Sequence, residues 1–295
     1  MSRSRRWQFV SWLCCAVIVA SAAAMSAADL KAAAGPLTVV VMDPLALPLS
    51  CPCVKGYAQR DYEKLAASLK AQLGRDVKLV FSESLSKALD GDANGKADLI
   101  IGKQSVVLFD AKHNQQTVTP VAMLEGKDGL TTQTGLVVVP SEDPATSVAD
   151  LKDYVIIFGP EECDEKYAAA LELLKSHGVA PPSDIETSPS CSDGASLILE
   201  AGPTVRGAAV ISSYAKPLLE GCGTIKKGAL RVVGETAAVP FVGAFVTESL
   251  AGADRAEVVA ALLKATADAK VREALETRGG FVPVKDSSVA AAKKK

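Results

Sequence analysis

Four cysteines fall in segments that we expect to be loops at the same edge of the predicted sheets. Cys51 and Cys53 form a Cys-x-Cys pair after the first strand-like run, Cys163 follows a later one, and Cys191 follows another. In doubly wound α/β folds, ligands bind beside the carboxyl ends of the strands. The sequence therefore predicts that these four thiols converge on one cleft.

Three chemistries are open to these thiols. The first is a disulfide, for which Cys163 and Cys191 are the better pair, because the one-residue spacing of Cys51 and Cys53 strains a bridge. The second is a soft metal site, in which all four thiolates are candidate ligands for Cu or Zn. The third is a redox-active thiol. Cys222, at the far end of a predicted helix, is expected to be a spare or buried thiol.

The residue types do not favour an enzyme. His113 and His177 lie near predicted helix ends, where we expect them in solvent. The sequence has no glycine-rich phosphate loop, no Ser–His–Asp spacing and no zinc-finger pattern. We therefore predict a binding protein with no catalytic residues.

Acidic residues crowd the turn after the strand-like run at 155–158, at Glu161, Glu162, Asp164 and Glu165. In the first turn of a helix, such side chains stabilise the helix through its dipole. If they face the cleft instead, they favour a cation, since two like charges a few Å apart cost on the order of 4 kcal/mol at an effective dielectric near 20. Both interpretations stay open, and the second makes Glu161 and Asp164 candidate ligand contacts.

Other polar and aromatic side chains follow predicted strands or begin predicted helices. Such groups fix the orientation of a small ligand by hydrogen bonds and stacking. We predict ligand contacts from Tyr57, Lys103, Ser105, Ser192 and Tyr214. Lys55, Arg60 and Asp61 are predicted to be surface charges.

Strand-length apolar runs alternate with segments of helical periodicity. The run at 37–42 is almost continuously apolar, which is typical of a strand buried on both faces. A helix over residues 60–73 ends at Gly74, and Asp254 with Glu257 forms a capping box that begins a helix. The same patterns predict further strands at 77–81, 99–102, 118–123, 155–158, 185–187, 208–211 and 230–234, and helices at 84–89, 106–111, 148–151, 164–177, 194–200, 214–220 and from about 270.

This alternation comes in two sets, separated by extended segments near residues 132–139 and 240–247. It predicts an α/β fold of two lobes, each a central sheet flanked by helices, with a two-segment hinge and a cleft between the lobes. The predicted organisation is a signal peptide at 1–28, lobe one at 37–132 and 247–285, lobe two with the hinge segments at 133–246, and a flexible tail at 286–295.

The N-terminus has the three parts of a secretory signal. A basic start over residues 1–6 precedes an apolar run at 7–19 and an alanine-rich stretch to Ala28. The apolar run, at about 13 residues, is short of the 20 or so that span a membrane. The sequence predicts export to the periplasm or cell envelope. Loss of the three arginines in this segment leaves a mildly acidic chain, which argues against nucleic acid as a partner.

One stretch has the pattern of a known protein class. Residues 147–159, Ser-Val-Ala-Asp-Leu-Lys-Asp-Tyr-Val-Ile-Ile-Phe-Gly, resemble a segment of type 2 periplasmic binding proteins, and so do 97–102, 194–214 and 280–284. The nearest family is the phosphate- and phosphonate-type substrate-binding proteins of ABC transporters. The resemblance implies a monomer that closes on a small molecule or ion and delivers it to an inner-membrane permease.

The acidic turn stands where this family usually has a small polar turn that holds an anion. The ligand therefore stays open between a phosphonate or phosphate and a cation. The alternative function is a cysteine-rich periplasmic metal-binding or redox-accessory protein with a cation-selective cleft.

Overall fold

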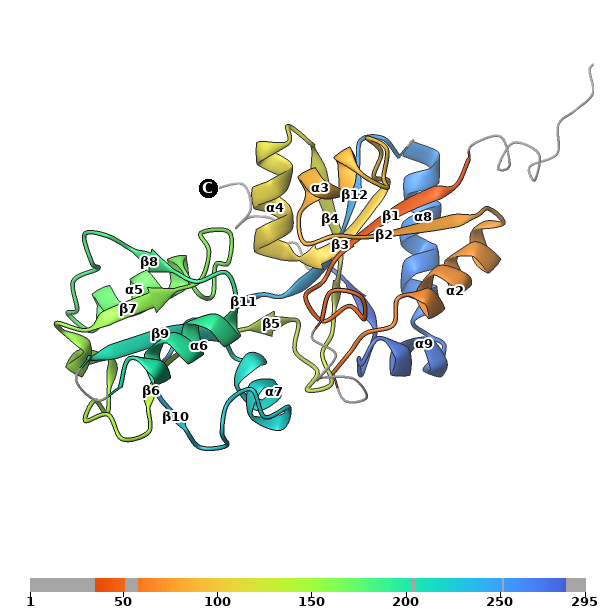
Figure 1. The fold of residues 1–295 in the computed structure, drawn as a ribbon. Helices are drawn as coiled ribbons and strands as arrows, with labels where there is room; N and C mark the ends of the chain where they lie inside the picture. Colours follow the sequence, from red (N-terminus) through yellow and green to blue (C-terminus); the bar gives the residue numbers. More distant parts are fainter. Residues whose placement is uncertain (1–34, 51–57, 203–204, 251, 285–295) are drawn as a thin grey trace, which may run out of the picture.

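The computed structural model describes residues 35–50, 58–202, 205–250 and 252–284. These residues form two α/β lobes that lie side by side (Figure 1). No helix in this part of the chain is long and apolar enough to cross a bilayer. The predicted fold class, a two-lobed periplasmic-binding-protein fold with sheets flanked by helices, is confirmed.

The first lobe is built on a six-stranded mixed sheet. Its strand order is β13-β4-β12-β3-β1-β2, with β1 parallel to β2 and β3, and β12 antiparallel to both β3 and β4. The interior strand β1 is buried at all six positions, as its apolar run predicts. The strands are β1 (Leu37–Met42), β2 (Val77–Phe81), β3 (Leu99–Lys103), β4 (Val118–Leu124), β12 (Val242–Thr247) and β13 (Phe281–Pro283).

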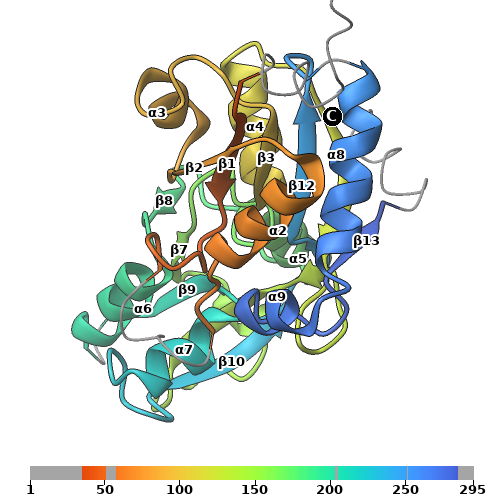
Figure 2. The same ribbon diagram turned by 90° about the vertical axis from the view of Figure 1, so that its right-hand side faces the viewer.

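Helices cover both faces of this sheet (Figures 1 and 2). One face packs against α2 (Glu63–Leu73), α8 (Gly252–Ala265) and α9 (Ala269–Ala274). The other packs against α3 (Leu85–Asp90) and α4 (Gln104–His113). Side chains of β3 pack into both apolar layers, and Lys103 is its last residue.

The second lobe repeats this layered arrangement on a smaller sheet. Its five strands have the order β10-β6-β9-β7-β8, in which β7 is parallel to β8 and β9. The strands are β6 (Gly135–Pro140), β7 (Val155–Phe158), β8 (Glu186–Thr187), β9 (Gly207–Ser212) and β10 (Leu230–Glu235). The 3-10 helix η2 (Val148–Leu151) and α5 (Ala168–Ser176) cover one face, and α6 (Cys191–Glu200) and α7 (Ala215–Gly221) lie toward the other.

The two crossings between the lobes pair with each other. β5 (Thr132–Gln133) and β11 (Val239–Pro240) form a short antiparallel ribbon that lies between the lobes in Figure 1. The chain rejoins the first sheet at Val242, where β12 begins, five residues before the predicted return at 247.

Several predicted helix starts are off by a few residues: α2 begins at Glu63 rather than at 60, and α6 at Cys191 rather than at 194. α5 begins at Ala168, four residues after Asp164, because residues 160–167 form successive turns in which the backbone N–H groups of Lys166 and Tyr167 both donate to the Cys163 carbonyl. The acidic residues therefore do not form a first helical turn. α8 begins at Gly252, so Asp254 lies inside its first turn.

Gly135 is required where the hinge enters β6. A Cβ atom there would lie 2.0 Å from the backbone oxygen of Glu165. Gly135→Ala should therefore lower the free energy of unfolding by roughly 1–3 kcal/mol or more, since overpacking against backbone forces a shift. Thermal unfolding measures this. Gly252→Ala is the matched control, because a Cβ there meets nothing within 4 Å. Equal unfolding temperatures for both variants would contradict the close approach.

Candidate functional site

A cavity of about 620 Å³ lies between the lobes. The first lobe contributes the chain after β1, the segment before α3, and the β3–α4 junction. The second lobe contributes the turn after β7, the start of α6, and α7. Both walls thus stand at the carboxyl ends of parallel strands, where α/β folds bind ligands.

A buried ion pair crosses between the lobes at this cavity. Lys103, the last residue of β3, places Nζ 2.6 Å from Oε1 of Glu165, and their side chains are 5% and 0% exposed. The hydroxyl of Ser212, at the end of β9, donates to the same Oε1 at 2.6 Å. Burial is the largest influence on the pKa of Lys103 and lowers it, but the charges and hydrogen bonds of Glu165 and Cys163 together raise it overall. Lys103 therefore stays charged.

The second oxygen of Glu165, Oε2, is buried and accepts no hydrogen bond. Hydrogen bonds to Oε1 offset the cost of removing that oxygen from water, but no hydrogen bond offsets the same cost for Oε2. An anion that approaches Lys103 would compete with the carboxylate of Glu165 for the Lys103 ammonium group.

A second buried cluster supports the wall of the first lobe. Arg60 Nη1 donates to Oδ2 of Asp43 at 2.9 Å, and the hydroxyl of Tyr62 donates to the same oxygen at 2.6 Å. Arg60 is only 5% exposed, so its prediction as a surface charge is wrong. Its partner Asp43 comes directly after β1 and is fully buried, which the local sequence around Arg60 does not indicate.

This cluster extends through the hinge into the second lobe. The Arg60 guanidinium lies over the ring of Phe241, 5.4 Å from its centroid. Phe241 directly follows β11 and stacks on Tyr214 with ring centroids 5.3 Å apart. Tyr214 is therefore held as part of the cavity wall by contacts that span both lobes.

The second lobe presents groups suited to an anion. Lys166 lines the cavity, and its stem packs on Gly159, where a Cβ would come within 2.6 Å of the Lys166 Cβ. Ser190 and Ser192 line the cavity at the start of α6, with their hydroxyl oxygens 2.8 Å apart. The first N–H groups of a helix have no intrahelical acceptor, and together with the dipole they favour a negative group.

Two of the four cysteines that were predicted at the cleft lie at the cavity, but they are not paired. Cys163 and Cys191 both line the cavity and are free, so the predicted disulfide between them is not present. The sulfur of Cys191 accepts the backbone N–H of Ser212 at 3.4 Å, which holds it against β9. Cys51 and Cys53 lie outside the described residues. Among those that are described, no group of three or more His, Cys, Asp or Glu side chains is placed to hold a metal ion.

The remaining predicted contacts divide into three groups. Lys103, Ser192 and Tyr214 line the cavity. Ser105, Glu161 and Asp164 do not: Glu161 is exposed, and the Ser105 hydroxyl instead accepts the backbone N–H of Asp164 at 3.4 Å. Tyr57 lies outside the part of the chain that the structure describes.

Several lining residues were not predicted. Glu83, Glu162, Lys166 and Ser190 belong to this set, and so does Cys222, which was expected to be a spare or buried thiol. Glu162 and Lys166 lie in the same acidic turn as Glu165, and the irregular backbone of that turn decides which side chains face the cavity. Ser190 could have been found as an N-cap, since its side chain accepts the N–H of Asp193.

Two α/β lobes on a two-segment hinge, with a cavity between them, define a type 2 periplasmic binding protein. A family model agrees and covers residues 56–289. The chain belongs to the family of periplasmic substrate-binding proteins of ABC phosphonate transporters. That family consists of transport components that bind a small molecule and work with a membrane permease, and it is an exported, periplasmic family.

Solved structures of low sequence identity share the fold. A binding protein component of an ABC phosphonate transporter from Pseudomonas aeruginosa has a TM-score of 0.65 at 14% identity, covering 88% of this chain and 84% of that chain. PhnD1 from Prochlorococcus marinus, in complex with methylphosphonate, has a TM-score of 0.63 at 12% identity, over 88% and 97%. A Xanthomonas citri protein bound to ATP has a TM-score of 0.64 at 16% identity, over 88% and 95%. No curated protein sequence matches.

The cavity thiols should differ in reactivity. A hydrogen bond with Thr224, whose hydroxyl oxygen lies 3.0 Å from the sulfur, lowers the pKa of Cys222, whereas burial raises the pKa of Cys163. The thiolate is the reactive form, so iodoacetamide at pH 8 should alkylate Cys222 faster, as read by peptide mass spectrometry. Thr224→Val should slow the alkylation of Cys222 and leave the alkylation rate of Cys163 unchanged. Faster labelling of Cys163 would contradict this order.

Proposed function

We propose that this protein captures a phosphonate- or phosphate-type anion in the inter-lobe cavity and delivers it to an ABC permease. The proposal rests on one observation. Two lysines, Lys103 and Lys166, line the same inter-lobe cavity as the start of α6, where Ser190 and Ser192 carry hydroxyl groups. Lysine ammonium groups and a helix N-terminus are established partners of tetrahedral oxyanions. The family to which the chain belongs supports the same class of ligand.

The charged residues of the cavity indicate which groups would bind the ligand. Its lining holds Lys103 and Lys166 but also Glu83 and Glu162, and Glu165 stands behind Lys103. With Lys103 already paired, Lys166 is the cation with most of its charge left for a ligand. The protein therefore uses helix N–H groups and hydroxyls for much of the binding, which suits a phosphonate better than a bare cation.

The inter-lobe ion pair also bears on the hinge motion. Lys103 and Glu165 come from different lobes, so separating the lobes breaks their contact. A ligand stabilises the closed form only as far as it binds that form better than the open one. We infer that the pair supplies part of the closed-state stability before the ligand arrives, and that the ligand supplies the rest.

Lys166→Met removes the proposed unpaired cation. Hydrogen bonds to charged groups contribute about 1.5–3 kcal/mol, so methylphosphonate should bind roughly 10- to 150-fold more weakly by calorimetry. Lys175→Met is the matched control, because Lys175 is exposed on the α5 side of the same lobe. Equal affinities for wild type and Lys166→Met would exclude Lys166 from the site.

Glu165→Gln removes the internal competitor of the ligand. Without ligand the variant should unfold at a lower temperature, because breaking a buried ion pair leaves a buried ammonium and costs about 3–5 kcal/mol. An anionic ligand then supplies the missing charge, so phosphonate should raise the unfolding temperature more in Glu165→Gln than in wild type. Glu172→Gln, an exposed carboxylate of α5, should behave as wild type. A smaller phosphonate-induced shift in Glu165→Gln would refute the competition.

A further inference from the structure

We propose that the apolar end of the cavity is a subsite for the organic substituent of the ligand. The ligand class is then a phosphonate or phosphate monoester with an apolar substituent of several carbons. This inference rests on the proposed function, which places the anionic group at the lysine end of the cavity.

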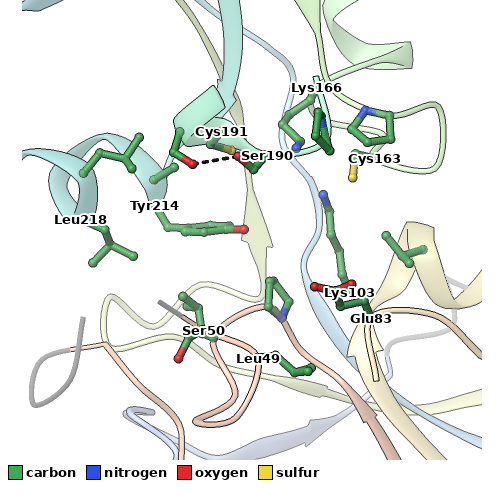
Figure 3. A pocket seen from close by; sticks show the side chains of 18 of the residues that line it. Leu49, Ser50, Glu83, Lys103, Cys163, Lys166, Ser190, Cys191, Tyr214 and Leu218 are labelled. Atoms are coloured by element: carbon green, nitrogen blue, oxygen red, sulfur yellow. Dashed lines mark hydrogen bonds between the residues drawn. The ribbon is translucent and has the colours of Figure 1, made fainter. Parts of the chain in front are cut away.

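The cavity has two chemically different ends. Figure 3 shows Lys103, Lys166 and Cys163 on one side and Leu218 on the other, with the ring of Tyr214 between them and its hydroxyl directed toward the lysine side. A ligand that lies along the cavity therefore meets cations at one end and hydrocarbon at the other.

Both lobes contribute apolar side chains to the cavity lining, and Leu218 marks the end away from the lysines (Figure 3). Leu45 and Leu49 come from the chain after β1 in the first lobe, and Leu218 and Leu219 from α7 in the second. All four line the cavity, and Leu49, Leu218 and Leu219 are only partly buried. A substituent that contacts leucines of both lobes would remove apolar surface of both from water, so the same contacts would favour binding and closure.

The size of the cavity points the same way. Its volume of about 620 Å³ lies within the range of about 300–1,000 Å³ that encloses drug-sized ligands. An anion of a few atoms, such as phosphate or methylphosphonate, would occupy only the lysine end and would not reach Leu218 and Leu219. A longer ligand fills both ends.

The test is calorimetry with methyl-, propyl- and hexylphosphonate on the full chain. Burial of one methylene should tighten binding about fourfold, so the dissociation constant should fall at each step until the apolar end is filled. Hexanol, which has the chain but no anionic group, should bind far more weakly than hexylphosphonate.

Leu218→Ser should reduce the ratio of the methyl- to the hexylphosphonate dissociation constants, and so should Leu49→Ser if it folds. The matched control is Leu47→Ser, since Leu47 belongs to the same segment as Leu49 but is 48% exposed and does not line the cavity. It should keep the wild-type ratio.

The outcomes separate this inference from the proposed function. If methylphosphonate binds and longer chains bind no more tightly, the apolar subsite is overturned and the proposed function stands. If none of the three phosphonates binds, both are overturned. If Leu47→Ser and Leu218→Ser reduce the ratio of the methyl- to the hexylphosphonate dissociation constants equally, the alkyl chain of the ligand lies outside the cavity. That result would overturn the subsite alone.

Discussion

The buried contact between Lys103 and Glu165 is the constraint on which the site depends. Lys103 Nζ, at the end of β3, lies 2.6 Å from Oε1 of Glu165 in the other lobe, beside the cavity. A lone charge is costly at such burial, so the ammonium of Lys103 and the carboxylate of Glu165 each depend on the other. Ser212 braces the carboxylate, and the close approach at Gly135 positions the turn that carries Glu165.

The layered fold could be predicted because its signals are local. The continuous apolar run of β1, the glycine that ends α2 and the N-cap Ser84 of α3 each depend on a few neighbouring residues. Convergence of Lys103, Cys163, Cys191 and Tyr214 on one cavity follows from the same signals, since parallel strands share their carboxyl edge.

The pairing of charges could not be predicted in the same way. Arg60 is close to other charged residues in sequence, yet it is buried and pairs with Asp43, which directly follows β1. Glu165 stands among four acids of one turn, and only the turn geometry after Pro160 selects it for the interior. Both outcomes depend on long-range contacts and on irregular backbone, neither of which leaves a periodic pattern in the sequence.

The position of β12 has a consequence for how the molecule is made. This strand lies between β3 and β4, so the first sheet has a gap at its centre until residues 242–247 have been synthesised. All strands of the second sheet precede that point in the chain. Because domains tend to fold as units as their residues become available, the second lobe can complete its core while the first lobe still exposes unpaired strand edges. In this order of synthesis the first lobe is the last to complete its sheet, so its unpaired strand edges are available for intermolecular pairing for longer.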